Sequence, residues 1–192
     1  MTVDDLSQLE PISEPMDEDK FWSIVNKSLQ EAGNEDDQLK WLISEIGKMT
    51  AEEMVGFRLQ CERLVWELYT SEMWCAGYLM NGGCSDDGFE YFRRWVVSRG
   101  KDVYYNAKAD PDSLISQVTE DSEIDFGFEF ESFSYASIDA FKEKFKKNIW
   151  DYTDYETFRT KRGYTLEITF NWKENEPETM KAICPKLYER CW

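Results

Sequence analysis

Residues 74–95 read WCAGYLMNGGCSDDGFEYFRRW, and this stretch predicts a corner between two helices. An apolar helical run ends at Asn81, Gly82 and Gly83, which are residue types that tolerate the left-handed backbone of helix ends. Ser85 follows as a good N-terminal cap for a second helix. The stretch therefore predicts a helical hairpin.

The acidic residues after the turn leave several uses of the corner open. Asp86 and Asp87 fall in the first turn of the second helix, where negative charge complements the helix dipole, so a plain hairpin accounts for them. With the last carbonyl groups of the first helix they also form an oxygen-rich surface that could suit a hard cation, although the calcium-loop pattern is absent. The N–H groups of Gly82, Gly83 and Cys84 could instead hold a phosphate, which the neighbouring carboxylates disfavour.

Aromatic residues near the turn offer a further interpretation, a ledge that binds a partner. These aromatic residues are Trp74, Tyr78, Phe89, Tyr91 and Trp95. Across all interpretations the candidate binding residues are Trp74, Tyr78, Asn81, Gly82, Gly83, Cys84, Ser85, Asp86, Asp87, Tyr91 and Arg94. No residue is assigned to catalysis and no cofactor is expected. If a metal binds, the candidate ligands are Asp86 and Asp87.

Charge restricts the classes of partner. The chain has 192 residues, with 22 basic and 39 acidic side chains and a net charge of −17. This charge disfavours nucleic acids and anionic membranes as partners and suits a basic protein. Histidine is absent, which excludes Ser-His-Asp and Cys-His catalysis and all imidazole metal ligands. The sequence specifies no oligomeric state.

The cysteines and the N-terminal residues indicate the cytoplasm. The five cysteines are an odd number without a C-x-x-C pair, so neither a disulfide framework nor a thiolate zinc site is expected. The first residues are acidic and lack the regions of a signal peptide, and no apolar run has the length of a membrane span.

Apolar periodicity predicts a mainly α protein, a single-domain helical bundle with a long central helix and a helical hairpin. Helices are expected at about 17–33, 36–48, 50–79, 85–100, 101–108, 111–118, 129–147 and 177–192, the last of them interrupted by Pro185. The alternation at 164–172 predicts a strand, which could form a short β-hairpin with 151–158 or 124–128. The expected organisation is a disordered acidic tail at 1–16, a helical core at 17–148 and a C-terminal extension at 149–192 that packs on the core.

The chain contains the strings DEDKFW at 17–22, YLMNGGCSDDGFEYFRRW at 78–95, ADPDSL at 109–114 and CPKLY at 184–188. Together these strings resemble a bacterial family of proteins of unknown function, DUF4240. The resemblance covers about residues 16–145 and, more loosely, the last dozen residues, whereas 150–176 departs from the pattern. It implies a helical fold and a bacterial-type origin, and it assigns no catalytic residues.

Two functions from different classes follow. The first is a non-enzymatic protein-binding module, of a regulatory or immunity type, that docks a basic partner. The alternative is a metal-dependent hydrolase or other enzyme centred on residues 81–88. Adjacent residues on a helix point about 100° apart, so Asp86 and Asp87 do not easily face one small site. The sequence therefore favours the binding module.

Overall fold

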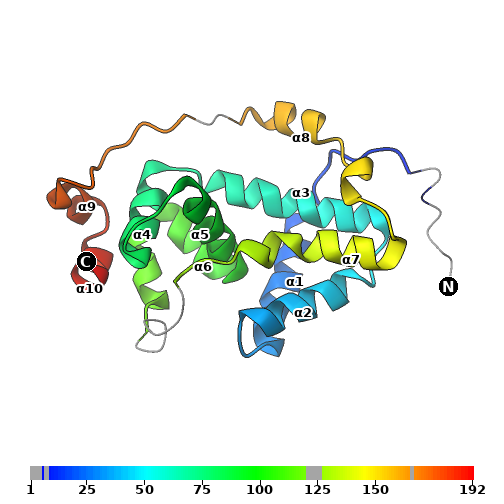
Figure 1. The fold of residues 1–192 in the computed structure, drawn as a ribbon, viewed down its shortest axis with the longest axis horizontal. Coiled ribbons are helices and arrows are strands. Elements are labelled where there is room, and N and C mark those ends of the chain that lie inside the picture. Colours follow the sequence, from blue (N-terminus) through cyan, green and yellow to red (C-terminus); the bar gives the residue numbers. More distant parts are fainter. Residues whose placement is uncertain (1–5, 7–8, 120–126, 165–166) are drawn as a thin grey trace. The chain divides into compact units, whose positions relative to one another are not determined.

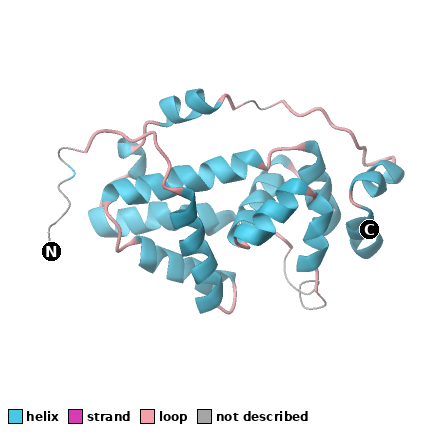
Figure 2. Ribbon diagram, turned by 180° about the vertical axis from the view of Figure 1, so that it is seen from behind, coloured by secondary structure: helices cyan, strands magenta, loops and turns pink. Residues whose placement is uncertain are grey.

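The computed structural model describes residues 6, 9–119, 127–164 and 167–192, and it confirms a mainly α protein (Figure 1). Within these residues the chain forms helices and loops, with no strand (Figure 2). The α-helices are α1 (Glu18–Glu31), α2 (Glu35–Ile46), α3 (Ala51–Glu67), α4 (Ser71–Asn81), α5 (Asp86–Ser98), α6 (Lys101–Ala109), α7 (Ala136–Phe145), α8 (Tyr155–Arg162), α9 (Pro177–Ile183) and α10 (Pro185–Cys191). The 3-10 helices are η2 (Pro111–Gln117), η4 (Glu131–Tyr135) and η5 (Ile149–Tyr152).

Local caps start the first helices where the sequence predicts them. The Asp17 carboxylate accepts a hydrogen bond of 3.0 Å from the Lys20 backbone N–H at the start of α1. At the start of α3, the Thr50 hydroxyl accepts from the Glu53 N–H at 3.2 Å, and the Glu53 carboxylate accepts from the Thr50 N–H at 2.9 Å. This reciprocal pair is a complete capping box.

The helix predicted at 50–79 is two helices, which corrects that prediction. α3 ends at Glu67, and α4 begins at Ser71 after a turn at 68–70. Thr70 caps α4, because its hydroxyl accepts a 3.2 Å hydrogen bond from the Met73 N–H. The apolar pattern runs through the turn, so periodicity alone did not reveal the break. α3 remains the longest of the described helices, with 17 residues.

The strand predicted at 164–172 is also wrong for the residues that the structure describes. Residues 167–172 are loop, 165–166 lie outside the described residues, and the proposed partner 151–158 forms parts of η5 and α8. The other proposed partner, 124–128, is described only at 127–128, which is loop. Trp172 is buried and donates its indole N–H to the Ser71 carbonyl at 2.8 Å. The buried Trp172 ring, and not strand pairing, therefore attaches this segment to the start of α4.

The described part of the N-terminal tail forms backbone hydrogen bonds with other residues of unit 1. Ile12 exchanges backbone hydrogen bonds with Tyr152 (3.0 Å) and Asp154 (2.8 Å), and the Met16 N–H donates to the Gly56 carbonyl at 2.8 Å. A β-carbon on Gly56 would lie only 3.1 Å from the Met16 nitrogen, so this close approach favours glycine. The remaining tail residues, 1–5 and 7–8, lie outside the described residues.

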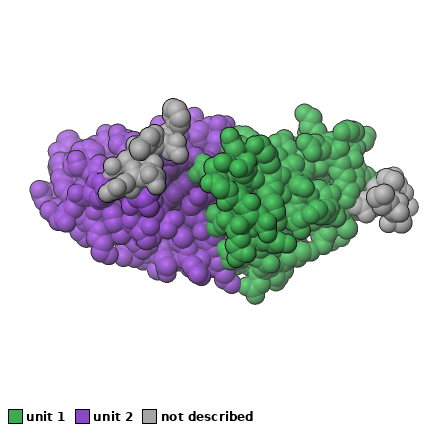
Figure 3. Space-filling view, turned by 90° about the horizontal axis from the view of Figure 1, so that it is seen from below, with its two compact units in different colours: residues 1–64, 132–165 green, residues 65–131, 166–192 purple. Residues whose placement is uncertain are grey.

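The chain divides into two compact units, each built from two separate segments (Figure 3). Unit 1 comprises residues 1–64 and 132–165, and unit 2 comprises residues 65–131 and 166–192. The core of unit 1 includes Phe21, Trp22, Leu42, Phe57, Phe141 and Phe158. The core of unit 2 includes Met73, Leu79, Phe89, Phe92, Tyr104, Leu114, Met180 and Leu187. The domain limits expected at 17–148 and 149–192 stay a prediction.

Candidate functional site

The corner between α4 and α5 has the predicted geometry and lies within unit 2. Gly82 has φ 64°, in the left-handed region. The N–H groups of Gly82 and Gly83 both donate to the Tyr78 carbonyl, Gly83 at 2.9 Å, and the Gly83 bond has the span of the Schellman motif that ends many helices. The two glycines therefore satisfy the Tyr78 carbonyl near the end of α4.

Ser85 caps α5 as the sequence predicts, since its hydroxyl accepts a 3.1 Å hydrogen bond from the Gly88 N–H. We expect Ser85→Ala to lower the free energy of unfolding by about 1 kcal/mol, the usual cost of losing an N-cap. Urea denaturation measures this change. Ser85→Asp keeps an acceptor and should retain most of the stability, and equal losses in both variants would contradict the capping role.

Two residues bring α4 and α5 into close contact. A β-carbon on Gly77 would lie 2.9 Å from the ring of Phe92, which is completely buried. Trp74 stacks on Phe89 with 4.4 Å between ring centroids and donates its indole N–H to the Cys84 carbonyl at 3.0 Å. Trp74 is only 9% exposed, so it packs inside the corner and little of its side chain reaches the surface.

Asn81 attaches a distant loop to the corner. Its side-chain carbonyl oxygen accepts a 2.7 Å hydrogen bond from the Phe128 N–H. A β-carbon on Gly127, which has φ 95°, would lie 3.0 Å from that same oxygen, so Gly127 is needed for this approach. Asn81 thus has a structural role that the sequence did not reveal.

Cys84 lies in surroundings that disfavour a thiolate. Burial, followed by the negative charge of Glu129, raises the pKa of Cys84 to about 12, and the positive charge of Arg93 opposes this only in part. The Glu129 carboxylate lies close to this turn, 3.1 Å from the point where a β-carbon of Gly88 would be. Burial also raises the pKa of the Glu129 carboxyl group.

Asp86 and Asp87 are exposed at the first turn of α5. Neither carboxylate forms a hydrogen bond or an ion pair with a residue that the structure describes. Among all the residues that the structure describes, no three Asp, Glu, Cys or His side chains come together in a way that could hold a metal ion. The cation interpretation of this corner therefore gains no support.

Arg94 and Tyr91 hold the loop before η4 against α5. The buried guanidinium of Arg94 donates to the Glu131 carbonyl at 2.8 Å, pairs with Glu90 and lies 5.7 Å from the centroid of the Tyr91 ring. The Tyr91 carbonyl accepts from the Phe130 N–H at 3.1 Å. Both candidate residues thus make contacts that a structural role explains.

The C-terminal extension brings exposed aromatic rings to the corner, which the sequence reasoning missed. Phe170 is 49% exposed and contacts Trp74 edge-on, with 5.2 Å between ring centroids. Trp192 is 52% exposed and lies 5.8 Å from the Tyr78 ring. Buried Trp172 lies between these contacts, 5.7 Å from Phe170 and 5.3 Å from Tyr78. We call Tyr78, Phe170 and Trp192, backed by Trp74 and Trp172, the aromatic ledge.

Carboxylates lie beside the aromatic ledge. Burial raises the pKa of Tyr78, and the nearby Glu174 carboxylate raises it further through its charge and a hydrogen bond. The Glu72 carboxylate accepts a 2.6 Å hydrogen bond from the side chain of Asn171, the neighbour of Phe170. The ledge therefore combines exposed aromatic area with negative charge.

These observations define a mainly helical protein with a capped corner and an aromatic ledge. The chain belongs to the family described as "Protein of unknown function (DUF4240)", whose model matches residues 16–143, more than half of the 192 residues. No curated protein and no solved structure matches the chain. The match includes the whole corner, and Phe170 and Trp192 lie beyond it. None of the helices in the described part of the chain is long and apolar enough to cross a membrane.

Proposed function

We propose that this protein is a non-enzymatic binding module of the cytoplasm, which docks a basic protein partner on the aromatic ledge. The observation that carries the proposal is the exposure of Phe170 and Trp192 beside the capped corner. Large aromatic rings are frequent energetic anchors of protein interfaces. Here Trp74 and Trp172 pack against Phe170, and Tyr78 and Tyr188 pack against Trp192, so both exposed rings lose little side-chain freedom on binding.

Charge supports a basic partner. The chain carries a net charge of −17, and Glu72 and Glu174 lie next to the ledge rings. An aromatic face attracts ammonium and guanidinium groups, and neighbouring carboxylates add to this attraction. Within the protein, Lys181 already lies over the Tyr188 ring at 5.5 Å, and Tyr188 in turn contacts Trp192.

The absence of disulfides among the described cysteines supports the cytoplasmic location. None of the five cysteines, all of which the structure describes, forms a disulfide, and Cys61, Cys75 and Cys184 are buried. Disulfides are rare in reducing compartments, where free buried thiols persist. No observation at residues 81–88 favours the alternative hydrolase over this module.

A synthetic peptide rich in lysine and arginine, without aromatic residues, tests the proposal by calorimetry. We expect Trp192→Ala and Phe170→Ala each to weaken its binding about tenfold or more, as for anchor residues of interfaces. The double variant Glu72→Gln with Glu174→Gln should weaken binding and reduce its dependence on salt, because it removes the local charge.

Trp150→Ala is the matched control, since Trp150 is a similarly exposed tryptophan of unit 1. Its affinity for the peptide should stay that of the unmodified protein. If all three aromatic variants bind the peptide equally well, the acidic surface alone attracts the peptide and the ledge is not the docking site.

A further inference from the structure

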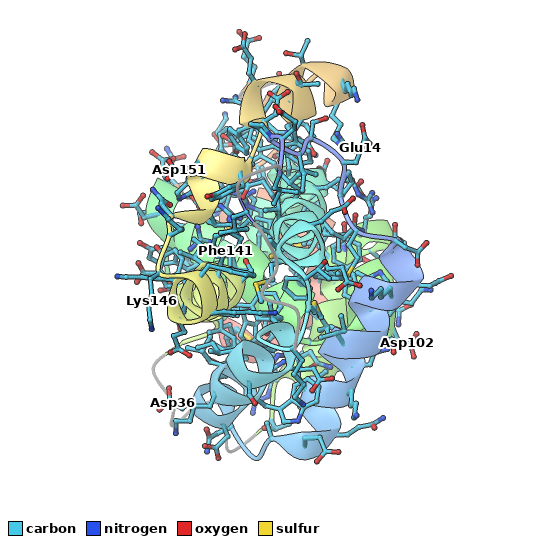
Figure 4. All side chains as sticks on the ribbon, turned by 90° about the vertical axis from the view of Figure 1, so that its right-hand side faces the viewer. Glu14, Asp36, Asp102, Phe141, Lys146 and Asp151 are labelled. Atoms are coloured by element: carbon cyan, nitrogen blue, oxygen red, sulfur yellow. The ribbon has the colours of Figure 1, made fainter. Side chains whose placement is uncertain are left out.

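Unit 1 contains an open hollow of about 640 Å³ where α7 ends and η5 begins. Three lysines and two isoleucines are among its lining residues. The lining residues are Ile138, Lys142, Lys146, Lys147, Asn148 and Ile149. Figure 4 shows Lys146 projecting outward from the end of α7. We call this feature the lysine hollow, and its volume is within the range of small-molecule sites.

The lysines of this hollow differ from others in the chain. Many lysines of this acidic protein form ion pairs with carboxylates, including Lys20, Lys40, Lys48, Lys108, Lys161, Lys173, Lys181 and Lys186. The side chains of Lys142, Lys146 and Lys147 form no ion pair with a carboxylate of the described residues. The hollow is thus a cationic site on a chain with a net charge of −17.

The backbone at Lys146 gives a second reason to look for a ligand. Lys146 ends α7 with φ 56°, and no other non-glycine residue in the described part has a positive φ. Glycine is the usual residue at such a helix end, because a side chain there is strained. The helix dipole favours positive charge near this end of α7. A glycine at position 146 would keep most of this benefit, because Lys142 and Lys147 would remain. Strained residues of this kind cluster at functional sites.

The floor of the hollow is apolar. Ile149 is buried, Ile138 is half-buried, and the methylene chains of the lysines add further apolar surface around them. A ligand that fits must therefore combine negative charge with an apolar body. We propose that the lysine hollow binds a small amphipathic anion, with a phosphate or carboxylate head group held by Lys142, Lys146 and Lys147 and an apolar body over Ile138 and Ile149.

Phenyl phosphate is the probe, with inorganic phosphate and phenol as its two halves. Nuclear magnetic resonance titration should show that phenyl phosphate shifts the backbone amides of residues 138–149. Calorimetry should give it an affinity about tenfold or more above that of either half, because both parts of the site contribute. High salt should weaken the binding of phenyl phosphate and of phosphate, but not that of phenol.

Lys146→Gly separates binding from folding. This variant removes a charge and the backbone strain together, so its melting temperature should not fall. We expect it to bind phenyl phosphate about tenfold more weakly, the usual consequence of losing a charged hydrogen-bond donor. The control is Lys40→Gln on α2, which removes one exposed lysine of the same unit and should leave the affinity unchanged.

Two outcomes would overturn the proposal. One is that phenyl phosphate shifts no amide of the hollow, or that Lys146→Gly and Lys40→Gln weaken its binding equally, as for diffuse attraction to surface lysines. The other is that phosphatidylcholine vesicles with anionic phosphatidylglycerol bind through the same lysines while phenyl phosphate does not. That result would assign the lysines to a membrane surface.

Discussion

Trp74→Ala is expected to lower the free energy of unfolding by about 4 kcal/mol, as is usual when a packed tryptophan is truncated. The indole ring stacks on Phe89, contacts Phe170 and donates a hydrogen bond to the Cys84 carbonyl. Alanine would leave a cavity between α4, α5 and the C-terminal extension and remove the group that supports the corner. Guanidinium denaturation, followed by circular dichroism, measures the loss.

Trp74→Phe is the control for that prediction. It keeps an aromatic ring but removes the indole N–H that bonds the Cys84 carbonyl. We expect it to cost only about 1 kcal/mol beyond the change in ring size, the contribution of one neutral hydrogen bond. If Trp74→Ala costs no more than Trp74→Phe, the ring does not support the corner in the way that its contacts indicate.

Asp112→Ala should produce the second large effect, a loss of about 3 kcal/mol in the free energy of unfolding. The buried carboxylate of Asp112 accepts hydrogen bonds from the backbone N–H groups of Lys186 (3.0 Å) and Leu187 (2.9 Å) at the start of α10. The Lys186 ammonium group lies 3.9 Å away and adds a favourable charge interaction. Without this carboxylate, α10 has no side-chain cap and should detach from η2.

Limited digestion with trypsin measures the detachment of α10. Cleavage after Lys186 and Arg190 should become faster in Asp112→Ala, while thermal melting reports the loss of stability. Asp110→Ala is the matched control, because the Asp110 carboxylate caps η2 by accepting from the Asp112 N–H at 3.1 Å. It should cost about 1 kcal/mol, as for an ordinary cap, and leave α10 protected. Equal digestion of both variants would show that Asp112 does not hold α10.

Local features of this fold are predictable from the sequence because their causes are local. Asp17, Thr50 and Ser85 each bond a backbone N–H three residues further on, so the residue types alone reveal these helix starts. Thr70 makes the same kind of cap, but continuous apolar periodicity across residues 68–70 concealed it. A cap inside a periodic run is therefore easy to overlook.

The contacts that form the candidate site are long-range, and the sequence did not reveal them. Phe170 meets Trp74, and Glu129 raises the pKa of Cys84, although about 96 and 45 residues of chain separate these pairs. No periodicity relates such distant positions. The alternation at 164–172 predicted strand pairing with Phe170 and Trp172 on one face, whereas the structure buries Trp172 and leaves Phe170 exposed.

The interleaved origin of the two units has a consequence for how the chain folds as it leaves the ribosome. Residues 1–64 cannot complete their core until 132–165 have been synthesised, and residues 65–131 must wait for 166–192. Contacts between such distant segments slow folding, and the apolar surface that waits for them is open to aggregation meanwhile. A nascent chain that stalls at residue 143, where the family match ends, would lack part of unit 1 and the whole second segment of unit 2. The need for chaperones should therefore be highest late in translation, when most but not all residues of both cores have been synthesised.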